Sequence, residues 1–270
     1  MARDGAIGEA AAGALPASLR LERDGAVAIL HLARPGKRNA LDDGTVLGLE
    51  QAMRSLPDDV GAVVLAGDGD HFCAGLDLST MTGRDAVAGM HHSRLWHRAF
   101  GEIEFGRVPV IAALKGAVIG GGLELAATAH IRVAERSAFY ALPEGQRGIY
   151  VGGGASVRLP RLIGLARMRD MMLTGRTYDA AEGQLIGLSQ YLVEAGEVLA
   201  KAVELAKRAA ANAPLTNFAL IQVLPRIAES DPASGYVTEA MMAAIAQSDP
   251  EAKGRLAEFL EGRAKKIAPT

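Results

Sequence analysis

The chain has 270 residues, of which 49% are hydrophobic and 22% are charged, and its formal net charge at pH 7 is −2. This composition is typical of a soluble globular protein that buries a large core, in one large domain or in a domain with an appendage. The nearly balanced charge argues against a nucleic-acid-binding surface and against a polybasic membrane patch. The single cysteine, Cys73, excludes an internal disulfide and a multi-cysteine zinc site, and we expect it to pack as a small apolar side chain.

The first segment, residues 1–17, is rich in alanine and glycine and lacks a basic start followed by a sustained apolar run. We therefore expect a flexible N-terminal tail and no signal peptide, which favours a cytoplasmic location. No apolar run in the sequence approaches the roughly 18 residues that a membrane-spanning helix needs, so no membrane span is expected.

Residues 19–34 alternate in polarity on both sides of Asp24-Gly25, which predicts a β-hairpin. The following elements alternate in type. They are a helix over 41–56, a buried strand over 60–66, a turn-rich loop over 67–75, a helix over 85–105, a buried strand over 108–114, a helix that begins in the glycine run 120–122 and a strand over 130–134. This alternation predicts an α/β core with repeated crossover units over residues 18–195.

From about residue 196 to residue 270 the pattern becomes helix after helix. Pro214, Pro232 and Pro250 stand where three of these helices are expected to begin, since proline is favoured at the first helical position. Several of the helices are apolar over much of their surface. That pattern indicates burial, either against the core of the same chain or against another subunit, and we expect this region to carry oligomer contacts.

The sequence GGGLELA at residues 120–126 combines three glycines with Glu124 in an apolar segment. Glycines before a helix let the backbone approach a ligand closely, and the helix N-terminus offers unpaired N–H groups. These features suit an anionic oxygen, although tight packing would also explain the glycines. Because the lysine and Ser/Thr of a P-loop and the spacing of a dinucleotide fingerprint are absent, an oxyanion is favoured over a nucleotide phosphate.

Two further segments offer related chemistry. HFCAGLDLS, residues 71–79, follows a buried-strand candidate and could bring a second set of backbone N–H groups to the same oxygen, or it is an ordinary connection. Glu144 ends a short apolar strand, and a second glycine cluster after it opens the next helix. With one strand returning between them, Glu124 and Glu144 could lie at one end of a sheet, where paired carboxyl groups divide acid and base roles.

Together these segments resemble the enoyl-CoA hydratase/isomerase superfamily, which has the crotonase fold of repeated ββα units. The resemblance runs from about Leu19 to Ile267. It rests on RPGKRNAL (34–41), HFCAGLDL (71–78), IAALKGAVIGGGLELAATAHIRVA (111–134), ALPEGQRGIYVGGGASVRLPRLIG (141–164) and LTGRTYDAAEGQLIGLSQYLV (173–193). The chain departs from the family pattern at Val151, where proline is frequent, and at Lys115, where asparagine is frequent.

The resemblance implies roles for four residues. The backbone N–H groups of Leu76 and Gly121 correspond to the family's oxyanion hole, which holds the thioester carbonyl, and Glu124 and Glu144 correspond to its two catalytic glutamates. Retention of both carboxyl groups favours an enoyl-CoA hydratase that adds water to a trans-2-enoyl-CoA. The alternatives are an isomerase or another enolate-forming lyase of the same fold, and a CoA-binding member that has lost catalysis.

The resemblance also implies a binding site for coenzyme A, which is part of the substrate, so no separate cofactor is expected. The residues expected to contact the substrate are Lys37, Arg38, Ala74, Leu78, Gly120 and Gly122, while Asp77 is expected to shape its loop. In the divergent segment 79–100, His91, His92, His97 and Trp96 could line the acyl pocket. Their spacing does not suit a metal site, and none is expected. By the same resemblance, we expect a homotrimer or a dimer of trimers.

Overall fold

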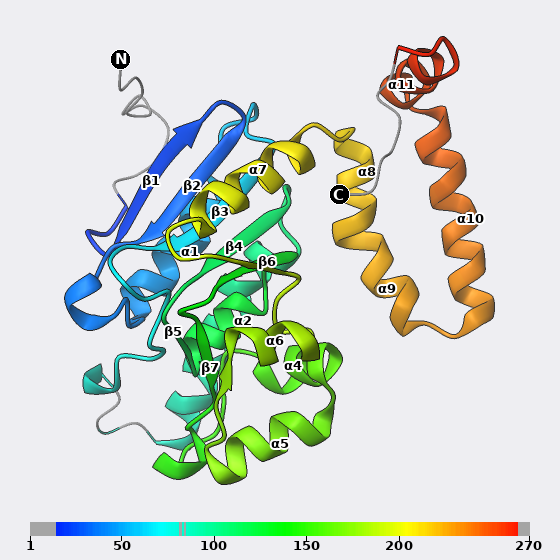
Figure 1. The fold of residues 1–270 in the computed structure, drawn as a ribbon. Helices are drawn as coiled ribbons and strands as arrows, with labels where there is room; N and C mark the ends of the chain where they lie inside the picture. Colours follow the sequence, from blue (N-terminus) through cyan, green and yellow to red (C-terminus); the bar gives the residue numbers. More distant parts are fainter. Residues whose placement is uncertain (1–14, 81–82, 84, 264–270) are drawn as a thin grey trace, which may run out of the picture.

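The protein forms an α/β core with a helical C-terminal part, shown in the computed structural model of Figure 1, which describes residues 15–80, 83 and 85–263. The strands are β1 (Leu19–Asp24), β2 (Val27–Leu32), β3 (Ala62–Gly67), β4 (Val110–Leu114), β5 (Ala117–Ile119), β6 (Ile131–Glu135), β7 (Phe139–Ala141), β8 (Tyr178–Asp179) and β9 (Tyr191–Val193). The helices are α1 (Asp43–Arg54), α2 (Ala86–Glu104), α3 (Gly121–Ala126), α4 (Ala155–Ile163), α5 (Leu165–Thr174), α6 (Ala180–Ile186), α7 (Val198–Ala210), α8 (Pro214–Phe218), α9 (Leu224–Glu229), α10 (Pro232–Ser248) and α11 (Pro250–Leu260). Short 3₁₀ turns are η1 (Pro35–Lys37), η2 (Leu78–Thr80) and η3 (Gly145–Arg147), and η4 (Ala219–Val223) is a π turn.

The larger sheet has the strand order β1-β2-β3-β4-β6-β9. The predicted hairpin is present, because β1 and β2 pair antiparallel around Asp24 and Val27, and every later neighbour in this sheet is parallel. Strands β2, β3 and β4 are buried along their whole length, as expected for parallel strands covered on both faces. Helices α1 and α2 pack on one face through residues such as Leu49 and Phe100, and α7 packs on the other through Ala202 and Leu205.

A second, smaller sheet has the order β5-β7-β8. The chain enters it twice in the same way: β4 lies in the larger sheet and the next strand, β5, in the smaller one, and β6 and β7 repeat this step. Strands β5 and β7 pair in parallel, with Ala117 opposite Phe139 and Ile119 opposite Ala141. Their carboxyl ends therefore meet at one edge, and the segments that carry Glu124 and Glu144 both begin there. Both carboxyl groups therefore lie at one end of a sheet, as expected. The strand that pairs with β5 in this sheet is β7, whereas the strand predicted over 130–134 corresponds to β6 and lies in the larger sheet.

Sequence patterns located the long elements and missed short ones. The helices predicted over 41–56 and 85–105 begin one residue after Asp42 and Asp85, whose side chains accept from the backbone N–H groups of Thr45 and Ala88. The helix after the glycine run is shorter than GGGLELAATA, because the chain turns after Ala126 towards β6. Strands β5, β8 and β9 and helices α5 and α6 were not predicted, since two- or three-residue strands carry too little periodicity.

The helices after residue 196 differ in where they pack. Pro214, Pro232 and Pro250 are the first residues of α8, α10 and α11, as predicted. Helix α7, although it follows residue 196, belongs to the core, because its buried face covers the larger sheet. Helices α8 to α11 extend away from the sheets (Figure 1).

Within the described residues, none of the helices combines the length and apolar character needed to cross a membrane. Most of the predicted tail, residues 1–14, lies outside the described residues.

Candidate active site

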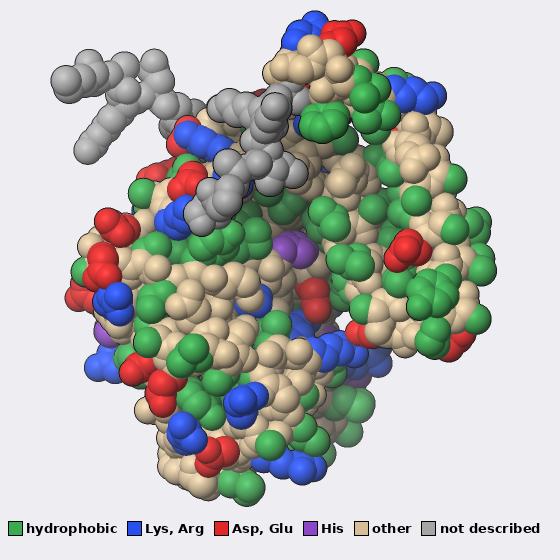
Figure 2. Space-filling view, turned by 45° about the vertical axis from the view of Figure 1, so that its right-hand side comes forward, with side chains coloured by type: hydrophobic (Ala, Val, Ile, Leu, Met, Phe, Trp, Pro, Cys, Tyr) green, Lys and Arg blue, Asp and Glu red, His purple; other side chains and the backbone are tan. Residues whose placement is uncertain are grey.

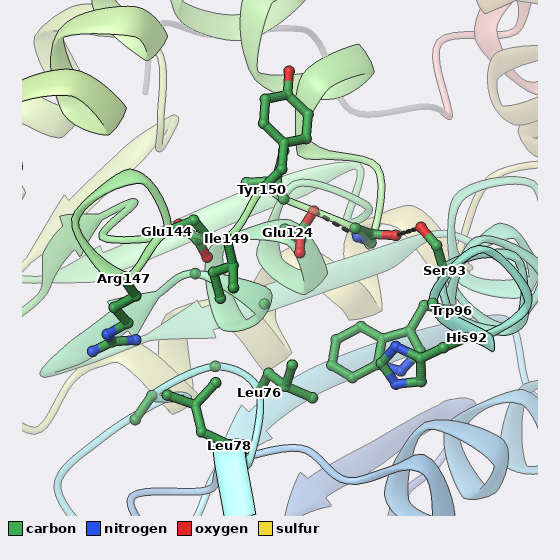
Figure 3. Close-up of a pocket in the computed structure, with 18 residues that line it drawn as sticks. Leu76, Leu78, His92, Ser93, Trp96, Glu124, Glu144, Arg147, Ile149 and Tyr150 are labelled. Carbon is green, nitrogen blue, oxygen red and sulfur yellow. Dashed lines mark hydrogen bonds between the residues drawn. The ribbon is translucent and has the colours of Figure 1, made fainter. Parts of the chain in front are cut away.

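A cavity of about 240 Å³ opens where the carboxyl end of the smaller sheet meets helix α2 and the loop after β3. Figure 3 shows that side chains from these segments face one another across it. Ten of the residues singled out in the sequence line this cavity: Ala74, Leu76, Leu78, His92, Trp96, Gly120, Gly121, Glu124, Glu144 and Val151. The structure therefore brings together the CAGLD loop, the glycine run and both glutamates, which are separated by up to 70 positions in the chain.

Two backbone N–H groups meet at the cavity wall. Leu41 donates its N–H to the Gly75 carbonyl (2.8 Å), and its carbonyl accepts from the Asp77 N–H (2.7 Å). In this parallel bridge the N–H of Leu76 itself points away from Leu41. Gly121 is the first residue of α3, so its N–H has no acceptor within the helix. Within the described part of the chain, neither of these two N–H groups donates a hydrogen bond to the backbone or to a side chain.

Glycine is required where these two segments cross. Gly120 has φ +52°, and a Cβ there would lie 2.5 Å from Oε1 of Glu144. Gly75 has φ +93°, and a Cβ there would lie 2.7 Å from the Ile119 carbonyl oxygen and 3.2 Å from the Gly121 nitrogen. A side chain at either position would force the two backbones apart. The glycines therefore hold the Leu76 and Gly121 N–H groups close together at the cavity, where both could donate to one oxygen.

Glu124 lies one turn into α3 and is 3% exposed. Its Oε1 accepts hydrogen bonds from the backbone N–H groups of Gly153 (2.8 Å) and Ala155 (2.9 Å). Burial raises the pKa of Glu124, and these two backbone donors oppose that rise. Since Oε1 is held by the backbone, the second oxygen is left on the side of the cavity (Figure 3).

Glu144 follows β7 and is 7% exposed. Its Oε2 is buried and has no hydrogen-bond partner among the described residues. Burial, with a smaller contribution from the nearby Glu124 charge, raises the pKa of Glu144 to about 7, while Arg147 acts in the opposite direction. The two carboxyl groups therefore differ in environment: Glu124 is held by the N–H groups of Gly153 and Ala155, whereas Glu144 receives only the N–H of its own backbone and has one buried oxygen without a partner among the described residues.

The glycine cluster 152–154 has a role that the sequence did not reveal. It was expected only to open the next helix, yet the N–H of Gly153, together with that of Ala155 just after the cluster, holds Glu124. Arg147, Ile149 and Tyr150, which also line the cavity, were not singled out either. Val151, the departure from the family pattern, is buried and lines the cavity beside Gly152. A second glycine run, which follows the segment with Glu144, was the available signal for this contact.

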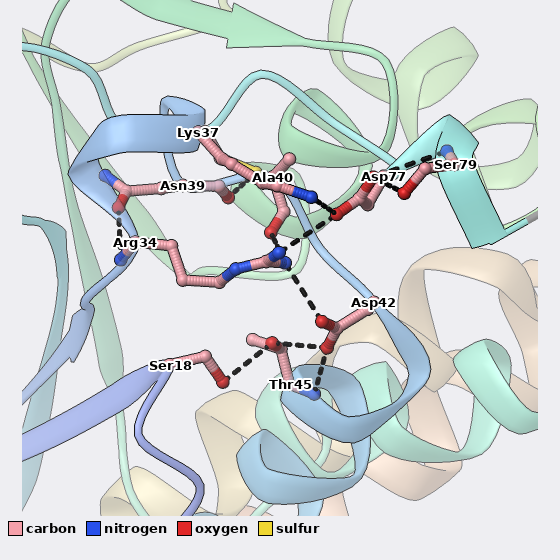
Figure 4. A network of polar contacts seen from close by, with 10 residues as sticks. Ser18, Arg34, Lys37, Asn39, Ala40, Asp42, Thr45, Asp77 and Ser79 are labelled. Atoms are coloured by element: carbon pink, nitrogen blue, oxygen red, sulfur yellow. Dashed lines mark hydrogen bonds and ion pairs between the residues drawn. The ribbon is translucent and has the colours of Figure 1, made fainter.

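Lys37 and Arg38 lie in a shallow hollow that adjoins the cavity and shares Ala74, Leu76 and Leu78 with it. Lys37 Nζ is not free, because it pairs with Asp77 Oδ2 at 2.9 Å, and Arg34 donates to the same oxygen (Figure 4). These hydrogen bonds, with that from Ser79, hold the pKa of Asp77 well below its usual range. Asp77 therefore ties its loop to the 34–38 segment, which is the loop-shaping role expected for it.

Asn39 fixes the same segment from inside. It has φ +57°, its side-chain oxygen accepts from the Arg34 N–H, and its amide donates to the carbonyls of Asp68 (2.9 Å) and His71 (2.8 Å). Cys73 is fully buried in the core, as expected, and its thiol contacts the Asn39 carbonyl at 3.1 Å.

Gly122, by contrast, does not line the cavity: a Cβ there would lie 2.3 Å from the Cys73 carbonyl oxygen, so it serves close packing.

The histidines of helix α2 separate onto different faces. His92 and Trp96 line the cavity, whereas His91 faces a surface hollow with Arg94 and Arg98. His97 is outside both sets of lining residues, and burial lowers its pKa. Among the described residues, no group of three or more His, Cys, Asp or Glu side chains is placed to hold a metal ion.

The chain belongs to the enoyl-CoA hydratase/isomerase family, whose model matches residues 22–267. It is 35% identical over 198 residues to the short-chain-enoyl-CoA hydratase of Clostridium acetobutylicum, a match that covers 72% of this chain and 76% of the relative. This membership confirms the family and the enzyme class predicted from the motifs, at the level of a crotonase-family enzyme.

Solved structures agree with the fold. A Rhodopseudomonas palustris protein provisionally named an enoyl-CoA hydratase is 60% identical, with a TM-score of 0.89 over 91% of this chain and 95% of that one. A Thermobifida fusca protein with the same provisional name, solved in complex with CoA, is 27% identical, with a TM-score of 0.78 over 91% of this chain and 95% of that one. The crotonase fold predicted from the sequence is therefore confirmed.

Proposed function

We propose that the protein is an enoyl-CoA hydratase that adds water across the 2,3 double bond of a trans-2-enoyl-CoA thioester to give a 3-hydroxyacyl-CoA. The observation that carries the proposal is the cavity itself, where two unpaired backbone N–H groups lie beside two buried carboxyl groups of unlike environment. The hydratase names of the relatives and the CoA bound to the Thermobifida fusca protein support the same substrate class.

In this mechanism the thioester oxygen accepts hydrogen bonds from the N–H groups of Leu76 and Gly121. Glu124, whose Oε1 is fixed by two backbone donors, removes a proton from water with its second oxygen while the water oxygen bonds to Cβ. The electron pair of the double bond moves towards the thioester and forms an enolate, which the two N–H groups stabilise. Glu144, with its raised pKa, gives its proton to Cα, and the thioester carbonyl is restored.

The CoA part of the substrate is proposed to extend from the cavity into the adjoining hollow. Lys37 and Arg38 lie there with Ala74 and Leu78, and a cationic side chain suits the CoA phosphates. Because Lys37 is paired with Asp77, Arg38 is the side chain better placed to contact a phosphate. No separate cofactor takes part in this reaction.

The proposal is tested by incubating the protein with trans-2-enoyl-CoAs of several chain lengths and following loss of the conjugated thioester absorbance. Mass spectrometry should show addition of one water; an unchanged mass would indicate isomerisation instead. Glu124→Gln and Glu144→Gln should each reduce kcat by about 10²–10⁴-fold, as for loss of a positioned acid or base. Glu135→Gln, which changes another buried glutamate outside the cavity, is the matched control and should keep the wild-type rate. CoA thioester binding without turnover would refute the proposal.

A further inference from the structure

The end of the cavity remote from the CoA hollow contains a polar side chain with no role in the proposed hydration. Ala74, Leu76, Leu78 and Arg147 line both the cavity and the hollow with Lys37 and Arg38, so they mark the CoA end. On the other side of the two glutamates the wall is formed by Ser93, Trp96 and His92 from helix α2 (Figure 3). An acyl chain whose thioester lies at Leu76 and Gly121 would extend towards this wall.

Trp96 and His92 form this wall in sequence along α2. A Cβ on Gly121 would lie 3.0 Å from the Trp96 ring, which places the indole directly beside one of the proposed thioester donors. His92 is one helical turn before Trp96, and the two ring centroids are 5.6 Å apart. Trp96 makes the contact with Gly121, and His92 lines the cavity beside it. An acyl chain that extends along this wall would meet His92.

The contact with Asp43 determines which nitrogen of His92 carries the proton. Nε2 lies 2.7 Å from Oδ1 of Asp43, which also accepts from the Trp96 indole N–H at 3.3 Å. A carboxylate can only accept, so in the neutral form of the ring, which is the form considered below, the proton is on Nε2 and Nδ1 has a free lone pair. Nδ1 has no hydrogen-bond partner among the described residues and is not fully buried, and His92 lines the cavity.

At the acyl end of the cavity, the lone pair on His92 Nδ1 is the hydrogen-bond acceptor that the neighbouring groups leave available. The Ser93 hydroxyl is already used, because it donates to the Gly152 carbonyl. Trp96 offers only its ring to the cavity, since its N–H is turned to Asp43. The charge of Asp43, which contacts His92, would oppose an anionic acyl terminus at this end of the cavity. A neutral hydrogen-bond donor is the chemistry that fits an accessible acceptor in such a place.

We propose that His92 Nδ1 accepts a hydrogen bond from a hydroxyl group on the acyl chain, so that hydroxylated acyl-CoA thioesters are preferred substrates. The proposal rests on the proposed function for the direction of the acyl chain. It makes Asp43 a positioning residue, because Asp43 fixes the tautomer and the ring plane of His92.

The test measures binding and needs no turnover. Dissociation constants are determined by calorimetry for saturated straight-chain acyl-CoAs, for their terminally hydroxylated analogues and for analogues with a terminal carboxylate, at several chain lengths. At one chain length the hydroxylated analogue should bind about five- to tenfold more tightly than the unsubstituted one, which is the effect of one added hydrogen bond. The carboxylate analogue should bind no better than the unsubstituted one.

Two variants separate substrate recognition from a purely structural tie between helices α1 and α2. Gln at position 92 places its amide near Nε2, so His92→Gln can keep the Asp43 contact but loses the acceptor at Nδ1; its preference for the hydroxylated analogue should disappear. Asn places its amide near Nδ1, so His92→Asn should keep part of the preference while losing the Asp43 contact. If His92 only ties α1 to α2, His92→Asn, which loses the Asp43 contact, should be less stable than His92→Gln. Neither variant should then change the binding ratio.

Equal affinities for hydroxylated and unsubstituted analogues at every chain length would overturn the proposal, as would tighter binding of the carboxylate series. An unchanged binding ratio in His92→Gln would do the same. If the protein binds these thioesters but hydrates no enoyl-CoA, the proposed function fails, while the binding ratio still decides the role of His92.

Discussion

The Glu144 carboxyl group lies against the backbone of Gly120, in a space that any Cβ at position 120 would fill. The same space is poor in hydrogen-bond donors, since Glu144 Oε2 has none among the described residues. The packing that brings the glycine run close to Glu144 is thus also what removes water from its carboxyl group. A side chain placed in this way is adapted to hold a proton near neutral pH, at a cost to the stability of the fold.

This cost has a predictable pH dependence. The pKa of Glu144 is raised from the ordinary value of 4.5 to about 7, so between these values the folded protein keeps a proton that the unfolded chain has released. The free energy of unfolding therefore falls as pH rises through this range. Glu144→Gln removes the titrating group and should be more stable than wild type at about pH 8, by up to about 3 kcal/mol, with a smaller gain at about pH 5. Urea unfolding at both pH values measures this, and an equal difference at both would contradict it.

At the scale of elements, helix α4 holds the glycine segment that contacts Glu124. Arg158 on this helix donates from Nη1 to the Gly153 carbonyl (2.8 Å) and from Nε to Glu104 Oε2 (2.7 Å), and its side chain is 11% exposed. Arg158 thereby joins helix α2 to Gly153, the residue whose N–H contacts Glu124. Arg158 makes no hydrogen bond to Glu124 among the described residues, although its charge lowers the pKa of that carboxyl group, so we interpret it as a positioning residue.

Arg158→Met should therefore lower kcat by about a hundredfold with little change in KM, because a displaced Gly153 N–H misplaces Glu124. Arg158→Lys keeps the charge and should restore part of the rate. Arg161→Met is the matched control, since Arg161 lies on the same helix but pairs with Glu229 at the surface. Steady-state kinetics on one enoyl-CoA provide the comparison. Equal losses of kcat in both methionine variants would show that α4 matters only for general stability.

At the scale of the whole molecule, the C-terminal helices of a single chain carry apolar surface that the rest of the chain does not cover. Large apolar side chains on α10 and α11 are exposed, and Figure 2 shows hydrophobic side chains on the surface of this part. They are Tyr236, Val237, Met241, Ile245, Leu256, Phe259 and Leu260. Since α7 already covers the larger sheet, these helices have no further sheet surface to pack on. We propose that a second copy of the chain covers them, in the homotrimer or dimer of trimers expected from the resemblance.

Light scattering should then give a mass that is a multiple of 28.2 kDa at micromolar concentration. Val237 and Met241 lie one turn apart on α10 and are 61% and 62% exposed. Changing both to glutamate should shift the mass towards that of the monomer, because two charges would be buried in the contact. Glu239→Lys, a charge change on the opposite side of the same helix, should leave the mass unchanged. A monomeric wild-type protein would refute the proposed assembly.

The sequence alone determined the features that depend on local chemistry. The Asp24-Gly25 turn predicted the hairpin, the proline positions predicted three helix starts, and the glycine run beside Glu124 identified one side of the cavity. Each rests on backbone preferences or on periodicity that neighbouring residues express by themselves. Ordered motifs added the family and, through it, the expected oxyanion donors.

Tertiary structure decided the contacts between distant segments. Glu124 is held by backbone groups 29 and 31 positions away, and His92 is turned by Asp43, 49 positions away. The division into two sheets also belongs here, because strands of two or three residues gain their order from their neighbours. No local pattern encodes such pairs, since they arise when packing brings otherwise unrelated segments together, and packing also sets the burial that raises the pKa of Glu144.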